Sequence, residues 1–588
     1  FPAIYLTNYP ITVFSRERRP SGLAYRDLQA FIAALEKRGE LMRISAPVSP
    51  ILEITEIAGR VMKRGGPALL FERVEGSDFP LLINAMGSDA RMALALGAES
   101  LDEIGGDVAR YLDFGNYTSL GNLVRFAPRL PRLAACFPHR RRLRLTRPPC
   151  QQVIEREPDL SALPVLHCWP QDGGRFFTLP LVFTKLPGAR TQNCGMYRMQ
   201  VLDKTSTAMH WHKHKDGSAI YEAWRARGGK MPVAVALGCG PEITYAATAP
   251  LPPGLDEMLL AGFLRRRPVA LTKCVASDLW VPRDAQFVLE GYVDTEEPPV
   301  WEGPFGDHTG YYSLTDWYPR FHVTCVTRRR NPVYPATVVG RPPMEDCYLA
   351  KATERIFLPV LKLQMPQLCD LCLPFEGVFH NCAVVSVRND FPGAARTVMN
   401  AMWGMGQMRY TKLIVAVDAS VDPRDTGAVL AAVLQNADPA SDYLLSDGPL
   451  DALDHSSDRA LYGARLGVDA TAKPGVTPRP GRYALLPVQK RAPGDGREAA
   501  LAALEAEGVS FAVALDDTVD LADRSEVLWR VFNNIDAGRD LVVKDGKIAL
   551  DATKKLPGEG LTRPWPDDIT MSPEMAARVD ARWEEYGF

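Results

Sequence analysis

The chain has 588 residues, of which 46% are hydrophobic and 23% are charged, and its formal net charge is −2. This length exceeds what one hydrophobic core usually supports, so we expect about two to four domains. The low net charge provides no overall attraction to nucleic acid, and no apolar run reaches the ~18–20 residues that a membrane-spanning helix requires. Eleven scattered cysteines, an odd number, are typical of a protein of the reducing cytoplasm.

Regular hydrophobic periodicity begins only near Tyr25, and we interpret residues 1–24 as an extension or tag. Residues 25–150 are predicted to form an α/β domain, because apolar residues at helical spacing alternate with short apolar runs typical of strands. The predicted helices cover Tyr25–Lys37, Leu52–Lys63 and 91–115, and the predicted strands cover Leu41–Val48, Pro67–Val74 and Pro80–Ala85.

Residues 151–345 have a different texture, with short strands separated by frequent Gly and Pro, which is typical of a barrel or sandwich. We expect one helix in this region, over Asp256–Leu264. The predicted strands cover Leu181–Leu186, Met196–Leu202, Val233–Gly238, Val269–Cys274, Gln286–Val293 and Arg320–Thr327.

Residues 346–473 alternate helix and strand again, which predicts a second α/β domain. An internal repeat follows: a shift of 98 residues aligns 415–448 with 513–546, with 14 identities in 34 positions. Both copies should therefore share a strand–loop–helix–loop–strand plan. The second copy lacks the candidate site residues described below, so we interpret it as structural or interfacial. The Pro- and Gly-rich segment Lys473–Arg497 is interpreted as a linker.

Side chains that can carry chemistry are concentrated in the stretch NCGMYRMQVLDKTSTAMHWHKHKDG, where His210, His212 and His214 stand at every second position. In an extended segment this spacing places all three imidazoles on one face of a strand, which is compatible with a metal site. The alternative is a polar strand face with a single functional imidazole. A further carboxylate or amide ligand, for which Asn193 and Glu257 are candidates, favours Mn²⁺ or Mg²⁺ over zinc.

A second concentration is the stretch EGPFGDHTGYY, in which Glu302 and Asp307 flank a Gly-Pro-Phe-Gly segment. The glycines and the proline permit a tight turn that presents both carboxylates to one space. Two acids near one arginine titrate as a coupled set, which keeps one of them available as a proton donor. The alternative is a surface turn with two solvated acids. The chain contains no Walker A, HExxH, GxSxG or GxGxxG motif.

These stretches resemble the UbiD family of decarboxylases, which use prenylated FMN. The resemblance extends over roughly residues 25–473 and rests on segments in family order: TQNCGMYRMQV, PVAVALG, LEGYV, EGPFGDHTGYY, GRPPMED, LPFEG, RYTK and GVDATAK. It implies an α/β (α+β) fold with an N-terminal α/β domain (25–150), a central split β-barrel that holds flavin and metal (151–345) and a C-terminal α/β domain (346–473). Residues 474–588 are then a linker plus a degenerate repeat of the C-terminal unit.

The resemblance also implies a cofactor site built mainly from the first stretch. Asn193, His214 and Glu257 match the ligands of a Mn²⁺ ion that bridges to the cofactor phosphate, with a K⁺ ion nearby. Some relatives carry Arg-Gly where this chain has Lys215 and Asp216, so it departs from the family there. Besides the metal ligands, the matched cofactor-contact positions are Met196, Tyr197, Arg198, His210, Trp211, His212, Lys215 and Asp216.

Arg198, Glu302 and Asp307 resemble the catalytic Arg–acid–acid network of the family. The resemblance implies that Arg198 holds the substrate carboxylate, that Asp307 protonates the carbon that loses CO₂, and that Glu302 completes the proton relay. The implied reaction is the non-oxidative, reversible decarboxylation of an aromatic or unsaturated carboxylic acid by covalent catalysis on prenylated FMN.

The motifs resemble most the branch assigned to menaquinone biosynthesis, which implies a (prenylated) dihydroxynaphthoate or 4-hydroxy-3-polyprenylbenzoate as substrate. The alternatives are a small, hydroxybenzoate-like aromatic acid and, from a different class, a non-catalytic UbiD-like scaffold subunit. We expect a flavin prenyltransferase as cofactor supplier, a homodimer or higher homo-oligomer, and no nucleic-acid partner. We also expect a cytoplasmic location, with peripheral membrane contact if the substrate is prenylated.

Overall fold

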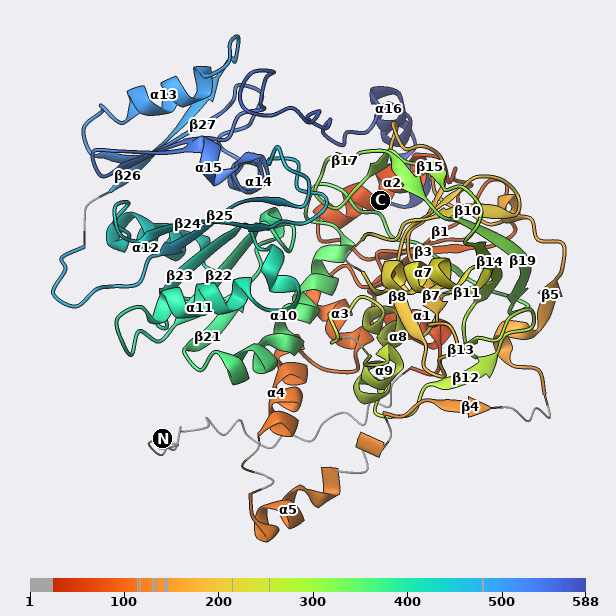
Figure 1. Ribbon diagram of the computed structural model, residues 1–588. Coiled ribbons are helices and arrows are strands. Elements are labelled where there is room, and N and C mark those ends of the chain that lie inside the picture. Colours follow the sequence, from red (N-terminus) through yellow and green to blue (C-terminus); the bar gives the residue numbers. More distant parts are fainter. Residues whose placement is uncertain are drawn as a thin grey trace.

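The computed structural model describes residues 25–588 apart from 114, 116–117, 130–132, 135, 142–145, 214, 253 and 479–480. Residues 1–24, the predicted extension or tag, lie outside the described residues. The chain forms two lobes (Figure 1). One lobe contains the N-terminal and central elements, the other contains the C-terminal sheets, and the long helix α10 (Glu345–Gln364) lies between them.

The N-terminal elements form a small sheet covered by helices. Its strands run in the order β1-β2-β3-β20, so the last strand comes from the end of the predicted central region, residues 151–345. The predicted helical stretch 91–115 consists of two helices, because the chain turns at Gly97 with a φ of +70° and Ser100 caps a second helix. The elements are α1 (Leu28–Lys37), β1 (Leu41–Ile44), α2 (Glu53–Lys63), β2 (Ala68–Phe71), β3 (Leu81–Ile83), α3 (Asp89–Ala95), α4 (Leu101–Leu112), α5 (Leu120–Phe126) and β20 (Tyr334–Pro335).

The central region is built around one curled sheet of nine strands, which confirms the predicted mixed α/β fold with a barrel-like centre. Eight strands are bonded in the order β6-β9-β10-β19-β14-β11-β7-β8, and β5 pairs with β19. The bonded path thus begins at β6 and ends at β8. The strands are β5 (Val153–Glu155), β6 (Phe176–Phe177), β7 (Leu181–Thr184), β8 (Asn193–Met196), β9 (Met199–Val201), β10 (Ser206–Met209), β11 (Lys230–Leu237), β14 (Phe287–Asp294) and β19 (Arg320–Arg328).

The predicted strand Met196–Leu202 is wrong as a single element. β8 ends at Met196 and pairs with β7, whereas β9 begins at Met199 and pairs with β6 and β10. Tyr197 and Arg198 therefore lie between two strands rather than inside one.

The expectation of one helix in the central region is also wrong. The predicted helix is present as α9 (Glu257–Arg265), but α7 (Asp216–Arg227) and α8 (Pro241–Ala246) occur as well. Within α7 only Gly217 and Ile220 are buried, so its sequence lacks the continuous apolar stripe that identifies an amphipathic helix.

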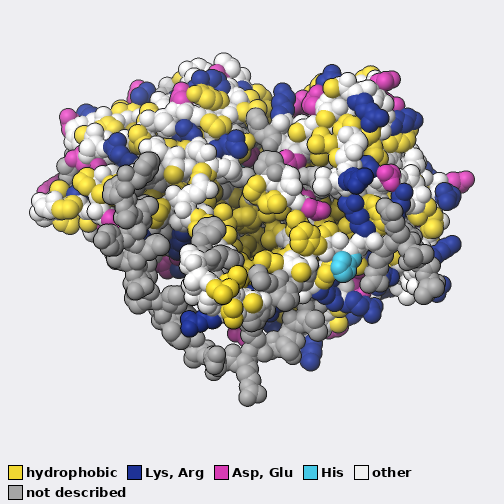
Figure 2. All heavy atoms as spheres, turned by 60° about the horizontal axis from the view of Figure 1, so that its bottom comes forward, with side chains coloured by type: hydrophobic (Ala, Val, Ile, Leu, Met, Phe, Trp, Pro, Cys, Tyr) yellow, Lys and Arg dark blue, Asp and Glu magenta, His cyan; other side chains and the backbone are white. Residues whose placement is uncertain are grey.

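A three-stranded sheet beside the central one joins β4 (His139–Arg141), β12 (Ala270–Lys273) and β13 (Trp280–Pro282). Apolar side chains are exposed nearby, on the segment that contains α5: Leu120, Val124 and Phe137 are 79%, 64% and 63% exposed. Figure 2 views the molecule from the side on which α5 projects in Figure 1, and hydrophobic side chains surround a hollow there. No helix of the described residues is long and apolar enough to cross a membrane.

The C-terminal lobe contains two sheets with the same plan, ordered β21-β22-β23-β25-β24 and β26-β27-β29-β28. In each, two parallel pairings are followed by one antiparallel pairing, which confirms the predicted repeat. We call residues 382–473 the first unit and residues 482–555 the second unit. The elements are β21 (Leu368–Cys372), β22 (Cys382–Val387), α11 (Ala394–Trp403), β23 (Leu413–Asp418), α12 (Thr426–Asn436), β24 (Tyr443–Pro449), β25 (Tyr462–Asp469), β26 (Arg482–Val488), α13 (Asp495–Ala503), β27 (Val509–Asp516), α14 (Arg524–Asn534), α15 (Ala537–Asp540), β28 (Leu541–Lys544), β29 (Lys547–Asp551) and α16 (Pro573–Ala581).

The prediction of a linker over Lys473–Arg497 is wrong for part of its length. β26 lies inside this segment and pairs in parallel with β27, and α13 begins at Asp495. The aliphatic run of β26 is short and is flanked by prolines and glycines, so the composition of the whole segment concealed a strand.

After the second unit the chain returns to the N-terminal elements. α16 and the 3₁₀ turn Trp583–Tyr586 pack beside α2, whose Glu53 side chain is fully buried. The Glu53 carboxylate accepts hydrogen bonds from Arg578 at 3.2 Å, from the Tyr586 hydroxyl at 2.7 Å and from Arg582. A buried carboxylate surrounded by donors in this way ties the two distant segments together.

Candidate active site

The acid stretch forms a hairpin, which we call the acid hairpin (residues 302–313). Its tip is closed by hydrogen bonds from the Gly310 N–H to the Asp307 carbonyl (3.0 Å) and from the Asp307 N–H to the Tyr311 carbonyl (3.2 Å). Glu302 is fully buried and Asp307 is 8% exposed, so the alternative of a surface turn with two solvated acids is wrong. The paired strands are β15 (Val300–Glu302) with β18 (Asp316–Tyr318), and β16 (Phe305–Gly306) with β17 (Tyr312–Ser313).

Arg198 joins the two acids of the hairpin, although about a hundred residues separate it from them. Its guanidinium donates to Glu302 Oε1 at 2.8 Å and Oε2 at 3.1 Å, and it also forms an ion pair with Asp307. A further hydrogen bond reaches the Ser313 hydroxyl at 3.0 Å, and the ring of Phe305 lies 4.6 Å from the guanidinium carbon. The structure therefore brings together all three predicted catalytic residues in one buried network.

The electrostatics of this network favour ionised acids. Burial alone would raise the pKa of Glu302, but the Arg198 charge and the hydrogen bonds from His210 and Arg198 hold it at about 2. Burial would likewise raise the pKa of Asp307, and the charges of Arg198 and His308 outweigh it and lower the pKa well below its usual range. In this arrangement Asp307 is an ionised carboxylate, so a proton for acid catalysis must be held by a neighbouring group.

Two of the three spaced histidines extend the network. His210 Nδ1 lies 3.1 Å from Glu302 Oε2, and His210 Nε2 lies 2.9 Å from His212 Nε2, so one imidazole of this pair donates and the other accepts. Burial lowers the pKa of both rings, that of His212 to about 3. The interpretation of a strand face is wrong, because β10 ends at Met209 and the histidines follow it in a loop. His214 lies outside the described residues.

A second pair of histidines was missed by the sequence analysis as site residues. His308 Nδ1 lies 3.0 Å from Asp307 Oδ1, and His308 Nε2 lies 3.2 Å from His380 Nε2. Asp451, from the connection between β24 and β25, lies 3.8 Å from His380 Nε2. The signal for His308 was its place directly after Asp307, and His380 follows the LPFEG segment closely. Nothing in the local sequence marks Asp451, which reaches the site only through the fold.

His308 is the group of this site that carries a proton most readily. Burial alone would lower its pKa, but the hydrogen bond and the charge of Asp307 outweigh burial and raise it. Burial lowers the pKa of His380, which has no carboxylate within hydrogen-bond distance among the described residues. The pair therefore stores its proton on His308, one hydrogen bond from the Asp307 carboxylate.

Two of the three predicted metal ligands lie side by side. Asn193 begins β8, Glu257 begins α9, and Glu257 Oε2 accepts a hydrogen bond from the Cys194 N–H at 2.9 Å. Glu257 is only 7% exposed, and burial raises its pKa to about 7, with the charges of Asp256 and Asp216 adding to the effect. A carboxylate and an amide oxygen in a crowded, buried anionic place fit a hard divalent cation. Apart from His214, which is not described, no group of three His, Cys, Asp or Glu side chains suited to a metal occurs in the described residues.

Three of the predicted flavin-contact residues, Tyr197, Trp211 and Met196, lie near Glu257 and the start of α7. The Tyr197 hydroxyl accepts a hydrogen bond from the Gly217 N–H at 3.2 Å, and Trp211 is buried with no hydrogen-bond partner for its indole N–H among the described residues. A Cβ at Gly217 would lie 2.6 Å from the Trp211 ring, so this glycine permits the close approach. A buried donor without a partner fits a ligand with acceptor atoms. Met196 ends β8 beside these residues.

Lys215 and Asp216 differ from the other predicted contact residues. Both side chains are exposed, and they stand at the N-terminus of α7, where Lys215 is the N-cap residue and Asp216 is the first helical residue. Both side chains therefore lie outside the buried acid network, although Asp216 is close enough to Glu257 for its charge to help raise the pKa of that carboxyl.

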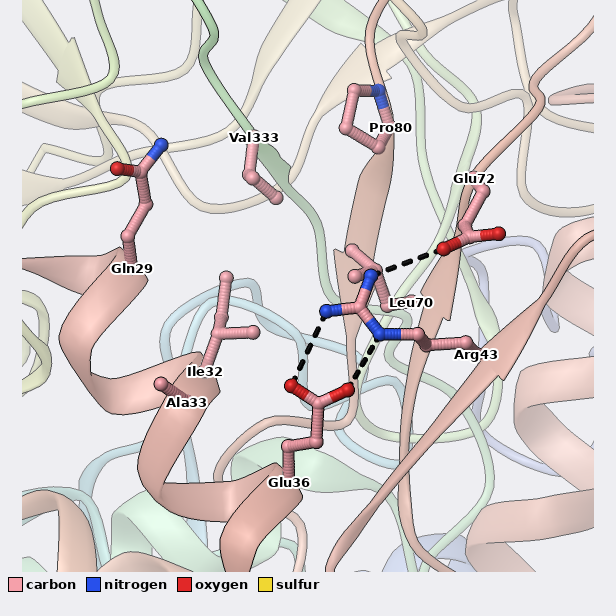
Figure 3. A pocket seen from close by; sticks show the side chains of 9 residues that line it. All are labelled: Gln29, Ile32, Ala33, Glu36, Arg43, Leu70, Glu72, Pro80 and Val333. Carbon is pink, nitrogen blue, oxygen red and sulfur yellow. Dashed lines mark hydrogen bonds and ion pairs between the residues drawn. The ribbon is translucent and has the colours of Figure 1, made fainter.

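A surface cavity of about 360 Å³ lies elsewhere, in the N-terminal part of the chain. Figure 3 shows that Arg43 crosses it and is held by Glu36 and Glu72, with the Arg43–Glu72 contact at 3.0 Å. None of the predicted site residues lines this cavity. Arg43 is the one cation among the residues that line the cavity, and it is already paired with Glu36 and Glu72. It is therefore not available to bind a substrate carboxylate.

Comparison with known proteins identifies the family. The models of the 3-octaprenyl-4-hydroxybenzoate carboxy-lyase match the chain in three parts: the N-terminal domain over residues 32–108, the Rift-related domain over 141–342 and the C-terminal domain over 347–470 and 480–561. The chain belongs to the UbiD family of carboxy-lyases. The C-terminal match resumes at residue 480, so the second unit of this UbiD protein is family sequence and not an unrelated addition.

Relatives of this UbiD protein extend over most of its length. An uncharacterised protein of Archaeoglobus fulgidus is 47% identical over 459 residues, which are 77% of this chain and 92% of the relative. The vanillic acid decarboxylase of Sedimentibacter hydroxybenzoicus in its closed form is 25% identical, with a TM-score of 0.67, and the match covers 82% of this chain and 98% of that structure.

A third relative has been solved with flavins. The UbiD-class enzyme HmfF of Pelotomaculum thermopropionicum in complex with FMN is 25% identical, with a TM-score of 0.64, over 77% of this chain and 95% of that one. An evolved dimeric form of HmfF in complex with prFMN is 23% identical, with a TM-score of 0.63, over 80% of this chain and 97% of that one.

Proposed function

We propose that this UbiD protein is a prenylated-FMN-dependent decarboxylase that removes CO₂ from an aromatic or unsaturated carboxylic acid, in a reversible reaction. The observation that carries the proposal is the buried network in which one arginine contacts two acids, with the imidazole of His308 3.0 Å from one of them. A scaffold subunit, the alternative class, has no need for a buried guanidinium and two acids held away from water.

The cofactor site is the place around Asn193 and Glu257. We propose that these two residues and His214 hold a Mn²⁺ ion, with a K⁺ ion nearby, and that Met196, Tyr197, His210, Trp211 and His212 contact the flavin. HmfF, a UbiD-class relative, was solved with FMN and prFMN, which supports a flavin here. When bound, prenylated FMN supplies an electron sink for the electron pair that a departing carboxyl group leaves behind.

Arg198 is suited to orient the substrate carboxylate. Its planar guanidinium matches a carboxylate in two hydrogen bonds, and its burial excludes the water that would otherwise solvate the charge. A substrate carboxylate that reaches Arg198 competes with Asp307 for the same guanidinium. The competition weakens the interaction that lowers the Asp307 pKa, so the pKa of Asp307 rises when substrate binds.

Proton delivery then follows from the short contact between His308 and Asp307. A proton on His308 Nδ1 lies one hydrogen bond, 3.0 Å, from Asp307 Oδ1 and moves there as the pKa of Asp307 rises. Asp307 next gives the proton to the carbon that has lost CO₂. Glu302 and His210 keep Arg198 in place from the opposite side of the guanidinium, and His380 connects His308 to further groups of the first unit.

Two substrate classes remain for this site. The first is a quinone precursor, a (prenylated) dihydroxynaphthoate or 4-hydroxy-3-polyprenylbenzoate, for which the exposed apolar residues around α5 provide a surface suited to peripheral contact with a membrane. The second is a small hydroxybenzoate-like acid, favoured by the similarity to a vanillic acid decarboxylase. We also propose a flavin prenyltransferase as cofactor supplier, a homodimer or higher homo-oligomer, and a cytoplasmic location.

The test is to produce the protein together with a flavin prenyltransferase, determine the mass of the extracted cofactor and the Mn²⁺ content, and measure CO₂ release from both classes of acid. The expected result is prenylated FMN with about one Mn²⁺ per chain and turnover of one class. Folded protein that contains neither flavin nor Mn²⁺ after this co-production would contradict the proposal and favour the scaffold alternative.

A further inference from the structure

The turn that carries Asp307 is held by a second set of contacts that the reaction itself does not use. Helix α14 of the second unit packs on this turn: the Trp529 indole N–H donates to the Thr309 carbonyl at 2.8 Å. The Trp529 ring also stacks on Tyr311, with ring centroids 4.9 Å apart and an angle of 20° between the planes. Both rings are only 2% exposed, so the contact is fully enclosed.

The Tyr311 hydroxyl is bound at the same helix. It donates to Asn534 Oδ1 at 2.7 Å and accepts a hydrogen bond from Arg530 at 3.1 Å. Between the two anchored residues stands Gly310, with a φ of +86°, where a Cβ would lie 2.6 Å from the Trp529 ring. The turn and the helix therefore fit together without spare room.

The segment that follows the second unit closes the turn from another side. The Tyr312 N–H donates to the Asp567 carbonyl at 3.1 Å, and the Ile569 N–H donates to the Gly310 carbonyl at 2.9 Å. Tyr311 and Asp568 are partners in an isolated antiparallel bridge. Asp568 also accepts a hydrogen bond from Arg530 at 3.0 Å, so the segment and helix α14 are bound to each other as well as to the turn.

The first unit shows that these contacts are additions to the shared fold. At the positions related by the shift of 98 residues, the first unit has Ala431 and Ala432 where the second has Trp529 and Arg530. Both units have an asparagine near the end of this helix, and its side-chain amide makes the equivalent hydrogen bond in each. Asn436 donates to the Ala470 carbonyl at 3.2 Å, and Asn534 donates to the Ala552 carbonyl at 3.0 Å. The fold of the unit thus needs the asparagine but not the tryptophan or the arginine.

We propose that the second unit is a positioning element for the acid hairpin, with Trp529 and Arg530 as positioning residues that hold the Asp307 carboxylate through the turn. Few contacts separate α14 from Asp307: the Asp307 N–H donates to the Tyr311 carbonyl, and the Tyr311 side chain is bound by α14. The catalytic consequence rests on the proposed function, since a displaced acid matters most where it must meet a reacting carbon.

The test compares Trp529→Phe and Tyr311→Phe with the control Arg524→Ala, which removes an exposed side chain at the start of the same helix. Trp529→Phe removes the N–H that binds Thr309 and keeps an aromatic ring, and Tyr311→Phe removes only the hydroxyl. Amide hydrogen exchange is measured for residues 305–313 in the flavin-loaded enzyme, together with kcat, KM and flavin content. The exchange measurement reports local opening of the hairpin whatever the reaction proves to be.

The expected result is at least about tenfold faster exchange at the turn in both variants, with the control unchanged. We expect kcat to fall ~10- to 100-fold with KM and flavin content unchanged. Combined with Asp307→Asn, Trp529→Phe should cause no further loss, because the acid that it positions is already absent.

Unchanged exchange at the turn in both variants would overturn the positioning role, even in an active enzyme. A fall in kcat that persists in full in the Asp307→Asn background would also overturn it, because the two residues would then act independently. Faster exchange in both variants of a wild-type protein that decarboxylates none of the acids would support the positioning element and contradict the proposed function instead. If Trp529→Phe does not fold, Tyr311→Phe, which keeps the stacked rings, decides the question.

Discussion

The two C-terminal units share one sheet plan but reach the acid hairpin with different parts. In the first unit the connection between β24 and β25 is long, residues 450–461, and brings Asp451 to His380 and His455 to Tyr311. In the second unit the corresponding connection is the two-residue turn Asp545-Gly546, with φ values of +50° and +71° that suit a tight hairpin. Helix α14 makes the contact there instead. The first unit thus supplies polar side chains near the acid hairpin, whereas the second unit packs a helix against the hairpin and supports it.

The largest expected effect comes from changing the acid that both units surround. Asp307→Asn keeps the size of the side chain and removes its acid–base function, so we expect flavin binding to persist and turnover to fall ~10²- to 10⁴-fold. Initial rates and flavin absorbance check this outcome. Asp316→Asn changes an exposed acid of β18, the strand that pairs with β15 beside the acid hairpin; it is the matched control and should retain its rate. Near-normal turnover of Asp307→Asn would remove this residue from the mechanism.

The second comparison concerns one lysine in each unit. Lys555 is 1% exposed and pairs with Asp540 at 3.3 Å and Asp551 at 3.1 Å. Lys473, at the matching place of the first unit, is 24% exposed and pairs with Asp442 at 3.0 Å. Removing Lys555 takes a charge partner from two buried carboxylates, Asp551 and Asp540, of which Asp540 keeps Arg539 at 2.7 Å. Lys555→Ala should therefore lower the free energy of unfolding by ~3 kcal/mol.

Lys473→Ala should cost only about 1 kcal/mol, because water reaches the carboxylates that it leaves behind. Urea unfolding followed by fluorescence compares the two variants with the wild type. Equal losses would show that the difference in burial between the units has no energetic consequence.

Acid stability tests the polar contribution of the first unit. Burial lowers the pKa of His455 to about 3, and the neutral ring packs on Tyr311 and Trp565 with centroids 4.2 and 4.6 Å away. A folded-state pKa below that of the unfolded chain means that unfolded protein takes up the proton first, so stability is lost as the pH falls below about 6.5.

His455→Phe removes this proton uptake, so its stability should decline less on acidification than that of the wild type, by about 2 kcal/mol between pH 7 and pH 5. Unfolding midpoints at several pH values give the measurement. His139→Gln, at an exposed position, is the control and should follow the wild-type profile. Parallel profiles for His455→Phe and the wild type would mean that His455 titrates normally in the folded protein.

The smallest expected effect concerns a feature that the two units share. Asp425 and Asp523 cap α12 and α14 with nearly identical backbone angles, φ −83° and ψ 91° against φ −81° and ψ 94°. Replacing either by Ala should cost about 1 kcal/mol of stability. Asp523→Ala should cost slightly more, because Asp523 also pairs with Arg341 at 3.4 Å. A large gap between the two variants in thermal unfolding would indicate that α14 depends on its cap more than α12 does.

Local sequence patterns predicted the repeated units well and the site only in part. Identities at matched positions made the plan of the second unit predictable, since the same caps and apolar positions recur. The alignment could not reveal what Trp529 contacts, because Thr309 is 220 residues away. The linker interpretation failed at β26, where Pro and Gly on either side outweighed a short aliphatic strand.

The acid network shows the same limit. The residue types around Glu302 and Asp307 indicated an acid–base site, but the same pattern allowed a solvated turn, and only the fold places Arg198 between the acids. His380 and Asp451 were missed as site residues because each stands in a turn or connection outside the two stretches that indicated chemistry. Their proximity arises because the turn before β22 and the connection between β24 and β25 both pack near His308, which no local sequence pattern can show.

The hydrogen bonds of the buried Glu53 carboxylate make the packing of the N-terminal elements depend on residues that are synthesised last. α2 forms early in a growing chain, yet the donors that satisfy its buried carboxylate, Arg578, Arg582 and Tyr586, are made more than five hundred residues later. Before these donors are synthesised, the Glu53 carboxylate must stay hydrated. The N-terminal elements therefore cannot reach their final packing around α2 until the C-terminal segment has been made. A chain interrupted before residue 578 would therefore lack all three of these donors, and burial of the Glu53 carboxylate would be unfavourable in it.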